Sequence, residues 1–425
     1  MVRKDDNYTD CIHILREELV PAMGCTEPVA IAYASALARD LLGAVPDRVL
    51  VTASGNIIKN VKSVIVPNTG GLKGIPAAAA AGIVVGESEK KLEAIAEAPA
   101  EKVPLIADYL EKTLIETVLA DTDLVFDLGV RVWAGDAEAA VRIVNNHTNV
   151  VRMEKNGNVL KDEPFGSNDE TGMTDRHFLT LKTIYDFAVT VDIEDVKDIL
   201  DRQIEYNMAI AEEGMQREYG ANIGKIIRYS RGDTLRARCI SMAAAGSDAR
   251  MNGCSMPVVI NAGSGNQGMT VSVPLIIYAR EKGLDQELLY RALVLSNLTS
   301  IYQKAGIGRL SAYCGAVNAG AAAACGIAFL DGADYRIIAH TLVNALAVSS
   351  GMICDGAKAS CAGKIVMALD AGMLGYDMII HGQQFRGGDG IVKKGVDNTI
   401  GNVGRLGKVG MRQTDIEILH MMIGE

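Results

Sequence analysis

Apolar residues recur with helical spacing near the start of the chain. Over residues 8–43 they stand three and four positions apart, which predicts amphipathic helices. Pro21 and Gly24 interrupt the pattern, so a second helix should begin near Thr26. We expect this first segment, residues 1–44, to be helical and to pack on the C-terminal domain.

A mixed pattern follows. Val-rich alternation predicts strands, amphipathic runs predict helices, and glycine and proline mark the loops between them. The Asn-Gly pair after Lys155 is typical of a turn between strands. The expected strands are residues 47–54, 62–66, 123–134, 138–145 and 149–155, and the expected helices are residues 77–85, 87–96 and 103–120. We therefore expect an α+β module over residues 45–165.

From residue 177 the pattern is helical nearly to the end, with glycine-rich breaks. A polar stretch at residues 160–175 is typical of a linker. Glycine and alanine are plentiful after residue 240, and small residues let helices and ligands approach closely. The predicted fold class is α+β: a small α/β N-terminal module and a larger all-α domain, residues 170–425, which carries the functional site.

Charge and composition narrow the possible partners. The chain has 425 residues, is 49% hydrophobic and carries a formal net charge of −10. This acidic balance disfavours non-specific binding to nucleic acid or to an anionic membrane. No apolar run approaches the roughly 20 residues of a membrane span, and the charged start does not resemble a signal peptide. We expect a cytoplasmic protein that binds a small molecule. The sequence leaves open whether it forms a homo-oligomer.

Three of the eight cysteines combine spacing with context. In a long cytosolic chain, cysteines are more often reduced, metal-binding or catalytic than disulfide-bonded. Cys354 and Cys361 would lie about 10 Å apart along one helix. Asp355-Gly356 breaks that helix, so Cys354 should lie in a loop and Cys361 in the helix that follows. Cys314 precedes a glycine at a similar loop-to-helix junction.

Helix N-termini stabilise thiolates at such positions. Three cysteine ligands would leave one iron of a four-iron cluster without a protein ligand, free to act as a Lewis acid. Spacing alone leaves open that these cysteines are buried structural residues. Cys25, in the segment GCTEP at a helix start, is either a thiolate base or nucleophile or a packed residue of the helix cap.

Two glycine-rich regions are candidate substrate sites. Backbone N–H groups of residues 261–269 (NAGSGNQGM) could bind a carboxylate, although a packing turn would have the same composition. The region is neither a phosphate loop nor a dinucleotide fingerprint. The candidate substrate-binding residues are Ser264, Asn266 and Gln267 here, Ser54, Asn56, Lys59, Asn68, Thr69 and Lys73 in the loops of residues 54–73, and His147 near a strand end.

The motifs occur in one order along nearly the whole chain: GCTEP, SGN, PNTGG, GSGNQG, YCG and MICDGAKASC. Together they resemble the L-cysteine desulfidase family, and the C-terminal half is similar to the α region of the bacterial iron–sulfur L-serine dehydratases. The resemblance implies a [4Fe-4S] cluster on Cys314, Cys354 and Cys361, no pyridoxal phosphate, and Cys25 as the base. Gly356 stands where the serine dehydratases have proline, which favours the desulfidase branch.

The function implied by this resemblance is β-elimination of L-cysteine to pyruvate, ammonia and hydrogen sulfide by a carbon–sulfur lyase. Two alternatives stay open. One is dehydration of L-serine or a related hydroxy amino acid. The other is a non-catalytic amino-acid-binding protein of the same fold. A helical scaffold with core cysteines is the plainest interpretation, and only the ordered set of motifs disfavours it.

Overall fold

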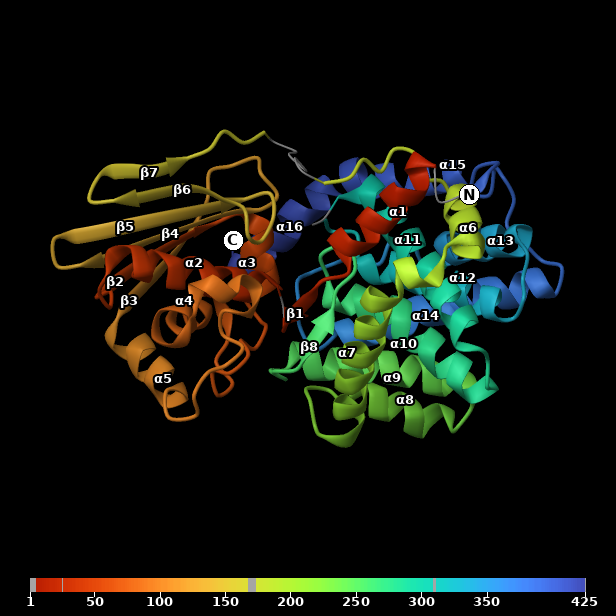
Figure 1. Cartoon of the computed structure of the whole chain (residues 1–425), viewed down its shortest axis with the longest axis horizontal. Helices are drawn as coiled ribbons and strands as arrows, with labels where there is room; N and C mark the ends of the chain where they lie inside the picture. Colours follow the sequence, from red (N-terminus) through yellow and green to blue (C-terminus); the bar gives the residue numbers. More distant parts are fainter. Residues whose placement is uncertain (1–4, 25, 167–172, 309–310, 425) are drawn as a thin grey trace.

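The computed structural model describes residues 5–24, 26–166, 173–308 and 311–424. Two bodies lie side by side, one built on a sheet and one built of helices (Figure 1). This mixed architecture confirms the predicted fold class.

The sheet body has six strands in the order β3-β2-β4-β5-β6-β7. β2 and β3 pair in parallel and the other neighbours are antiparallel. Side chains alternate between the faces, so in β4 Leu128, Val130 and Val132 are buried while Arg131 lies on the opposite face. The strands are β2 (Arg48–Ala53), β3 (Leu114–Leu119), β4 (Asp127–Ala134), β5 (Ala137–Val144), β6 (Val150–Lys155) and β7 (Asn158–Asp162).

Helices cover the buried face of this sheet. α2 packs on α4 and against β4 and β5 (Figure 1). Most of both helices is buried, and their many alanines allow a close crossing. The helices of this body are α2 (Thr26–Leu42), α3 (Gly55–Val61), α4 (Gly74–Val85), the short 3-10 helix η1 (Ser88–Glu93) and α5 (Val103–Lys112).

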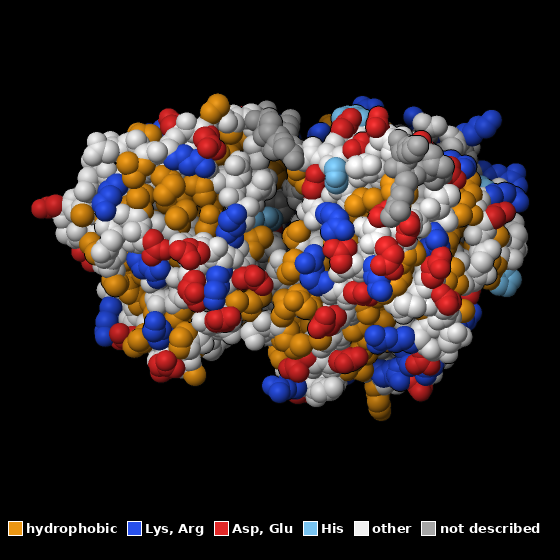
Figure 2. Space-filling view, in the orientation of Figure 1, with side chains coloured by type: hydrophobic (Ala, Val, Ile, Leu, Met, Phe, Trp, Pro, Cys, Tyr) orange, Lys and Arg blue, Asp and Glu red, His pale blue; other side chains and the backbone are white. Residues whose placement is uncertain are grey.

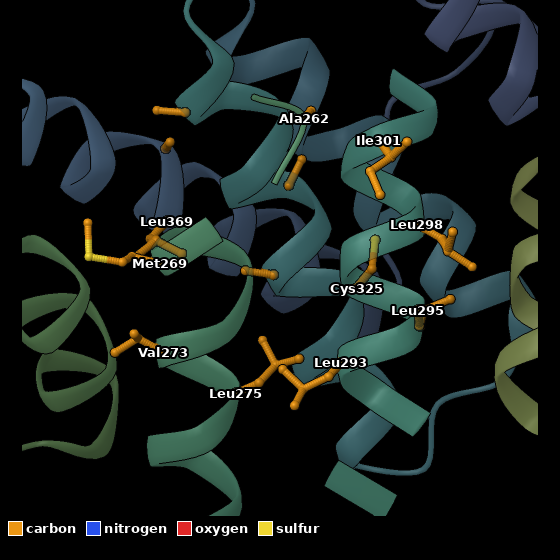
Figure 3. Close-up of a cluster of buried hydrophobic side chains, with 14 of the residues drawn as sticks. Ala262, Met269, Val273, Leu275, Leu293, Leu295, Leu298, Ile301, Cys325 and Leu369 are labelled. Atoms are coloured by element: carbon orange, nitrogen blue, oxygen red, sulfur yellow. The ribbon is translucent and has the colours of Figure 1, made fainter. Parts of the chain in front are cut away.

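The helical body has one large apolar core, to which Met269, Leu293, Leu298 and Leu369 belong (Figure 3). A two-stranded antiparallel ribbon, β1 with β8, lies at its edge. Its elements are α1 (Asp6–Glu18), β1 (Pro21–Met23), α6 (Leu181–Thr190), η2 (Ile193–Asp195), α7 (Lys197–Gln216), α8 (Ile223–Arg231), α9 (Leu235–Met251), β8 (Pro257–Val259), α10 (Gly265–Lys282), α11 (Gln286–Ile307), α12 (Gly315–Leu330), α13 (Tyr335–Ser349), α14 (Cys361–Ile380), α15 (Val396–Arg405), the π-helical turn η3 (Leu406–Gly410) and α16 (Arg412–Ile423).

Both terminal regions of the chain contribute helices that link the two bodies. α1 belongs to the helical core, whereas α2 packs on the sheet. α2 is apolar nearly all round and is therefore buried on most of its sides. α16 returns from the helical body to contact α3 (Figure 1). The limits 1–44, 45–165 and 170–425 stay predictions.

Three local expectations were wrong. Residues 103–120 are not one helix, because α5 ends at Lys112 and the β-branched segment that follows pairs with β2 as β3. Residues 62–66 form only an isolated bridge, Ile65 to Lys73. Residues 55–61 are helical rather than a loop. β7 follows the turn that was predicted after Lys155, although its bounds were not predicted.

Two further observations concern the surface. Within the described ranges, no helix has both the length and the apolar character that crossing a bilayer requires. Acidic and basic side chains are interspersed over the face seen in Figure 2, and this surface is indented where the two bodies meet.

Gly82 sets how closely α2 and α4 approach each other. A Cβ atom at Gly82 would lie 2.1 Å from the backbone oxygen of Ala32 on α2. Because backbone cannot yield as a flexible side chain can, Gly82→Ala should lower the free energy of unfolding by about 1–3 kcal/mol. Gly401→Ala is the control, since its Cβ meets nothing within 4 Å and should be neutral or stabilising. Urea unfolding of both variants tests this; equal stabilities would contradict it.

Candidate functional site

A pocket of about 790 Å³, part of it open to solvent, lies where the two bodies meet. The sheet body contributes the start of α2 and the end of α3, and the helical body contributes α9 to α12 and α14. The N-terminal ends of α2, α10, α12 and α14 all line it. Each helix N-terminus carries a partial positive charge, so the pocket favours anionic groups.

Cys314 and Cys354 lie next to each other because their loops pair through the backbone. The Cys314 N–H donates to the Met352 carbonyl at 3.0 Å, and the Cys354 N–H donates to the Ala312 carbonyl at 2.6 Å. Tyr313 and Ile353 form an antiparallel bridge between these bonds. Residues forty positions apart in sequence are thus fixed side by side, and Cys314 is also the N-cap of α12.

Cys361 reaches the same pocket through a reversal of the chain at Gly356. Gly356 has φ +92°, and a Cβ there would lie 2.1 Å from the backbone oxygen of Lys59 in α3. Glycine is therefore required both for the turn and for the close approach of the sheet body. Cys361 is the first residue of α14, and its thiol lies 3.7 Å from the Gly356 carbonyl. The predicted helix break between Cys354 and Cys361 is confirmed.

The three thiols are electrostatically unequal. A hydrogen bond from the Cys314 thiol, with the positive charge of Lys59, lowers the pKa of Cys354 below that of an ordinary thiol. The same hydrogen bond and burial raise the pKa of Cys314. Burial raises the pKa of Cys361. Of these three thiols, Cys354 is therefore the most readily ionised.

Among the described residues, four cationic side chains line the pocket: Lys59, Arg250, Lys304 and Lys364. Lys59 pairs with Asp415 of α16, and Lys364 pairs with Asp355. The Nε atom of Arg250 is buried and has no hydrogen-bond partner among the described residues, and buried charge is stable only when compensated. The pocket is therefore suited to an anionic group.

The donor set fits an iron–sulfur cluster better than a single metal ion. Over the described ranges, no three His, Cys, Asp or Glu side chains are close enough to hold one ion. Ligands of a cluster bind different iron atoms and so stand farther apart than ligands of one ion. Three cysteines line one cationic pocket, and iron–sulfur clusters are held by cysteine thiolates.

Comparison with known proteins places the chain in a family. A family model described as serine dehydratase alpha chain matches residues 87–420.

This chain belongs to the serine dehydratase alpha chain family.

Relatives that align over nearly the whole chain are named UPF0597 proteins. One from Desulfitobacterium hafniense is 55% identical over 429 residues, covering 100% of this chain and 99% of the relative. One from Treponema denticola is 46% identical, covering 97% of each chain. One from Bacteroides fragilis is 37% identical, also covering 97% of each chain. The sequence is thus similar to these proteins from the sheet body through to the last helix.

In this member of the serine dehydratase alpha chain family, seven of the sequence-predicted residues lie around the pocket. They are Lys59, Ser264, Asn266, Gln267, Cys314, Cys354 and Cys361. The glycine-rich region of residues 261–269 is not one continuous loop, because α10 begins inside it at Gly265. Cys25 lies outside the described residues; its neighbour Thr26 lines the pocket.

Six other candidates are not among the described residues that line the pocket. Three of them hold loops together. Ser54 Oγ donates to the Val125 carbonyl at 2.9 Å, Asn68 Nδ2 donates to two backbone carbonyls at 2.9 Å, and Thr69 Oγ1 donates to the Val66 carbonyl at 2.7 Å. Lys73 is an exposed residue before α4, Asn56 lies on α3, and the His147 ring packs edge-on against Phe126.

Sequence reasoning missed several polar residues of this family member's pocket: Thr26, Glu27, Asn60, Arg250, Lys304, Ser311, Tyr313 and Lys364. Glu27 accepts a hydrogen bond from Asn60 at 2.9 Å, which joins the start of α2 to α3. A signal was available for Arg250, since it is a charged residue in the segment AAAGSDARM, whose small residues predict a buried helix. Lys364 stands within the same segment as Cys354 and Cys361.

Proposed function

We propose that this chain is a carbon–sulfur lyase that eliminates the β-substituent of L-cysteine with the help of a [4Fe-4S] cluster and without pyridoxal phosphate. The observation that carries the proposal is the meeting of Cys314, Cys354 and Cys361 at one cationic pocket between the two bodies. The family match supports it, because a serine dehydratase by name removes the β-substituent of an amino acid.

Cys314, Cys354 and Cys361 would hold the cluster. When bound, it would supply an iron without a protein ligand, which acts as a Lewis acid toward the β-sulfur of the substrate. Lys59 and Lys364 would offset part of the negative charge of the three thiolates. The helix N-termini at Cys314 and Cys361 would stabilise the same charge.

The remaining residues would bind the substrate and move a proton. The start of α10, with Ser264, Asn266 and Gln267, would hold the carboxylate and the amine of the substrate. The thiolate of Cys25, which immediately precedes α2, would take the α-proton. The carbon–sulfur bond then breaks as the carbon–carbon double bond forms, and sulfide leaves. The resulting 2-aminoacrylate takes up water to give pyruvate and ammonia, so no oxidant or reductant is consumed.

L-serine is the second candidate substrate. The description of the matching family favours it, and a hydroxyl can also be polarised by a Lewis acid. The replacement of proline by Gly356 favours L-cysteine, by resemblance to the desulfidase branch. A non-catalytic amino-acid-binding protein would need neither the three cysteines nor Cys25.

One experiment separates these functions. The chain is reconstituted anaerobically with iron and sulfide and assayed with L-cysteine and L-serine for sulfide, pyruvate and ammonia. We expect equal amounts of all three products from L-cysteine and a kcat/KM at least about tenfold above that for L-serine, a difference of about 1.4 kcal/mol in the barrier. A preference for L-serine would make the chain a dehydratase. No turnover at full iron and sulfide content would rule out both.

A further inference from the structure

Arg250 is a buried cation without a counter-ion among the described residues. It lies in the last turn of α9, is 3% exposed and lines the pocket. Its Nε atom is buried and has no hydrogen-bond partner. An uncompensated buried guanidinium costs free energy, and proteins retain such groups where a ligand supplies the missing charge. Arg250 therefore points to an anion that enters the pocket.

The nearby carboxylates are engaged elsewhere. Asp415 pairs with Lys59, and Asp355 pairs with Lys364. Glu27 accepts a hydrogen bond from Asn60. Asp248, two residues before Arg250 on α9, accepts the Gly224 N–H at 2.8 Å, and burial raises its pKa to about 7. None of these groups takes the place of a ligand on Arg250.

The absence of a side chain at Gly265 leaves room for the Arg250 guanidinium at the start of α10. A Cβ at Gly265, the first residue of α10, would lie 2.3 Å from the Arg250 Nε. Gly315 makes room for Gln267 in the same way, because a Cβ there would lie 2.6 Å from the Gln267 side-chain carbon. The amide oxygens of Asn266 and Gln267 are buried and have no hydrogen-bond partner in the described structure. Donors and acceptors thus surround one small space at a helix N-terminus.

We infer that Arg250 binds the α-carboxylate of the substrate, between its guanidinium and the N-terminus of α10. The inference rests on the proposed function and narrows its substrate class to amino acids with a free carboxylate. A guanidinium presents parallel N–H donors that match the two carboxylate oxygens, and the helix N-terminus adds further donors. The amide oxygens of Asn266 and Gln267 are acceptors suited to the substrate ammonium group. Esters, amides and decarboxylated analogues should be excluded.

The test compares Arg250→Lys and Arg250→Met in the reconstituted full-length protein. Arg250→Met should raise the KM for L-cysteine roughly 10- to 100-fold, the value of a hydrogen bond to a charged group, with a smaller effect on kcat. Arg250→Lys should restore part of the affinity but not the bidentate geometry. Iron and sulfide content should not change. Discrimination between L-cysteine and its methyl ester should fall in Arg250→Met.

Stability separates a ligand-binding role from a structural one. Because the cation is uncompensated, Arg250→Met should unfold at the same temperature as the parent protein or higher. The matched control is Arg236→Met on the same helix, which loses an ion pair with Asp377 and should leave the KM unchanged. If Arg250→Met does not fold, Gly265→Ala carries the test, because its Cβ displaces Arg250 and should raise the KM in the same direction.

Binding of L-alanine, which lacks a leaving group, distinguishes failure of this inference from failure of the proposed function. Calorimetry should detect L-alanine binding to the parent protein and lose it in Arg250→Met. This result without turnover of L-cysteine or L-serine would contradict elimination and leave the carboxylate site in place. Turnover with unchanged KM in both Arg250 variants, or loss of iron from them, would overturn the role of Arg250 and leave elimination in place.

Discussion

Replacing Cys354 by serine should prevent assembly of the cluster and lower turnover of L-cysteine by at least about 10³-fold, since a Lewis-acidic metal contributes several kcal/mol to such a reaction. Cys354 is expected to be the most sensitive of the three ligands. Its thiol lies beside that of Cys314, and Lys59 favours its ionised form. Iron and sulfide content, visible absorbance and sulfide release after anaerobic reconstitution measure the effect.

Cys325 provides the matched control for this substitution. It lies in α12, the helix that Cys314 caps, and is fully buried. It is not among the described residues of the pocket, and burial raises its pKa well above that of an ordinary thiol. Cys325→Ala should therefore keep the cluster and the activity and lose only stability. Four irons per chain and full activity in Cys354→Ser would show that this cysteine is no ligand.

Replacing Cys25 by alanine should lower kcat by roughly 10²–10⁴-fold, the usual contribution of a general base, while the cluster stays intact. Proton abstraction and cluster binding should be affected separately, because the three proposed ligands lie on other segments of the chain. Cys25 directly precedes α2, whose first residues line the pocket. The substrate KM should change little, because proton abstraction is a property of the transition state.

Cys11→Ala is the control for Cys25. Cys11 lies in α1, and burial raises its pKa to about 12, so its thiol stays protonated at neutral pH. This variant should keep its kcat. Full activity in Cys25→Ala would remove the base assignment and leave the ligand assignment untouched. Loss of iron in Cys25→Ala would instead indicate that Cys25 contributes to cluster binding.

The local part of the candidate site could be predicted well because it depends on short-range chain geometry. A turn at Asp355-Gly356 separates Cys354 from the helix that begins at Cys361, and α12 begins at the glycine after Cys314. The ordered set of motifs resembles known families, and this resemblance implied that the three cysteines are cluster ligands. The backbone pairing of the Cys314 and Cys354 loops could not be predicted, because it joins residues forty positions apart.

The misassigned residues illustrate the limit of local reasoning. Ser54, Asn68 and Thr69 have the composition of a binding loop, yet their side chains bond to nearby backbone carbonyls. Arg250 is the opposite case: the small residues before it indicate a buried helix, but nothing beside it in the sequence identifies a ligand. Its importance follows from burial without a partner, which only the packed structure reveals.

The sequence by itself determined the two kinds of secondary structure, the large helical half and the loop-to-helix positions of the cysteines, because periodicity and glycine act over a few residues. Only the tertiary structure decided that α2 joins the sheet, that residues 114–119 form a strand, and that Lys59 of α3 approaches the Cys354 loop at Gly356. These arrangements depend on which apolar surfaces are buried against each other and on which charged groups are desolvated by that packing. Both free-energy terms depend on residues far apart in the chain, so no short segment determines them.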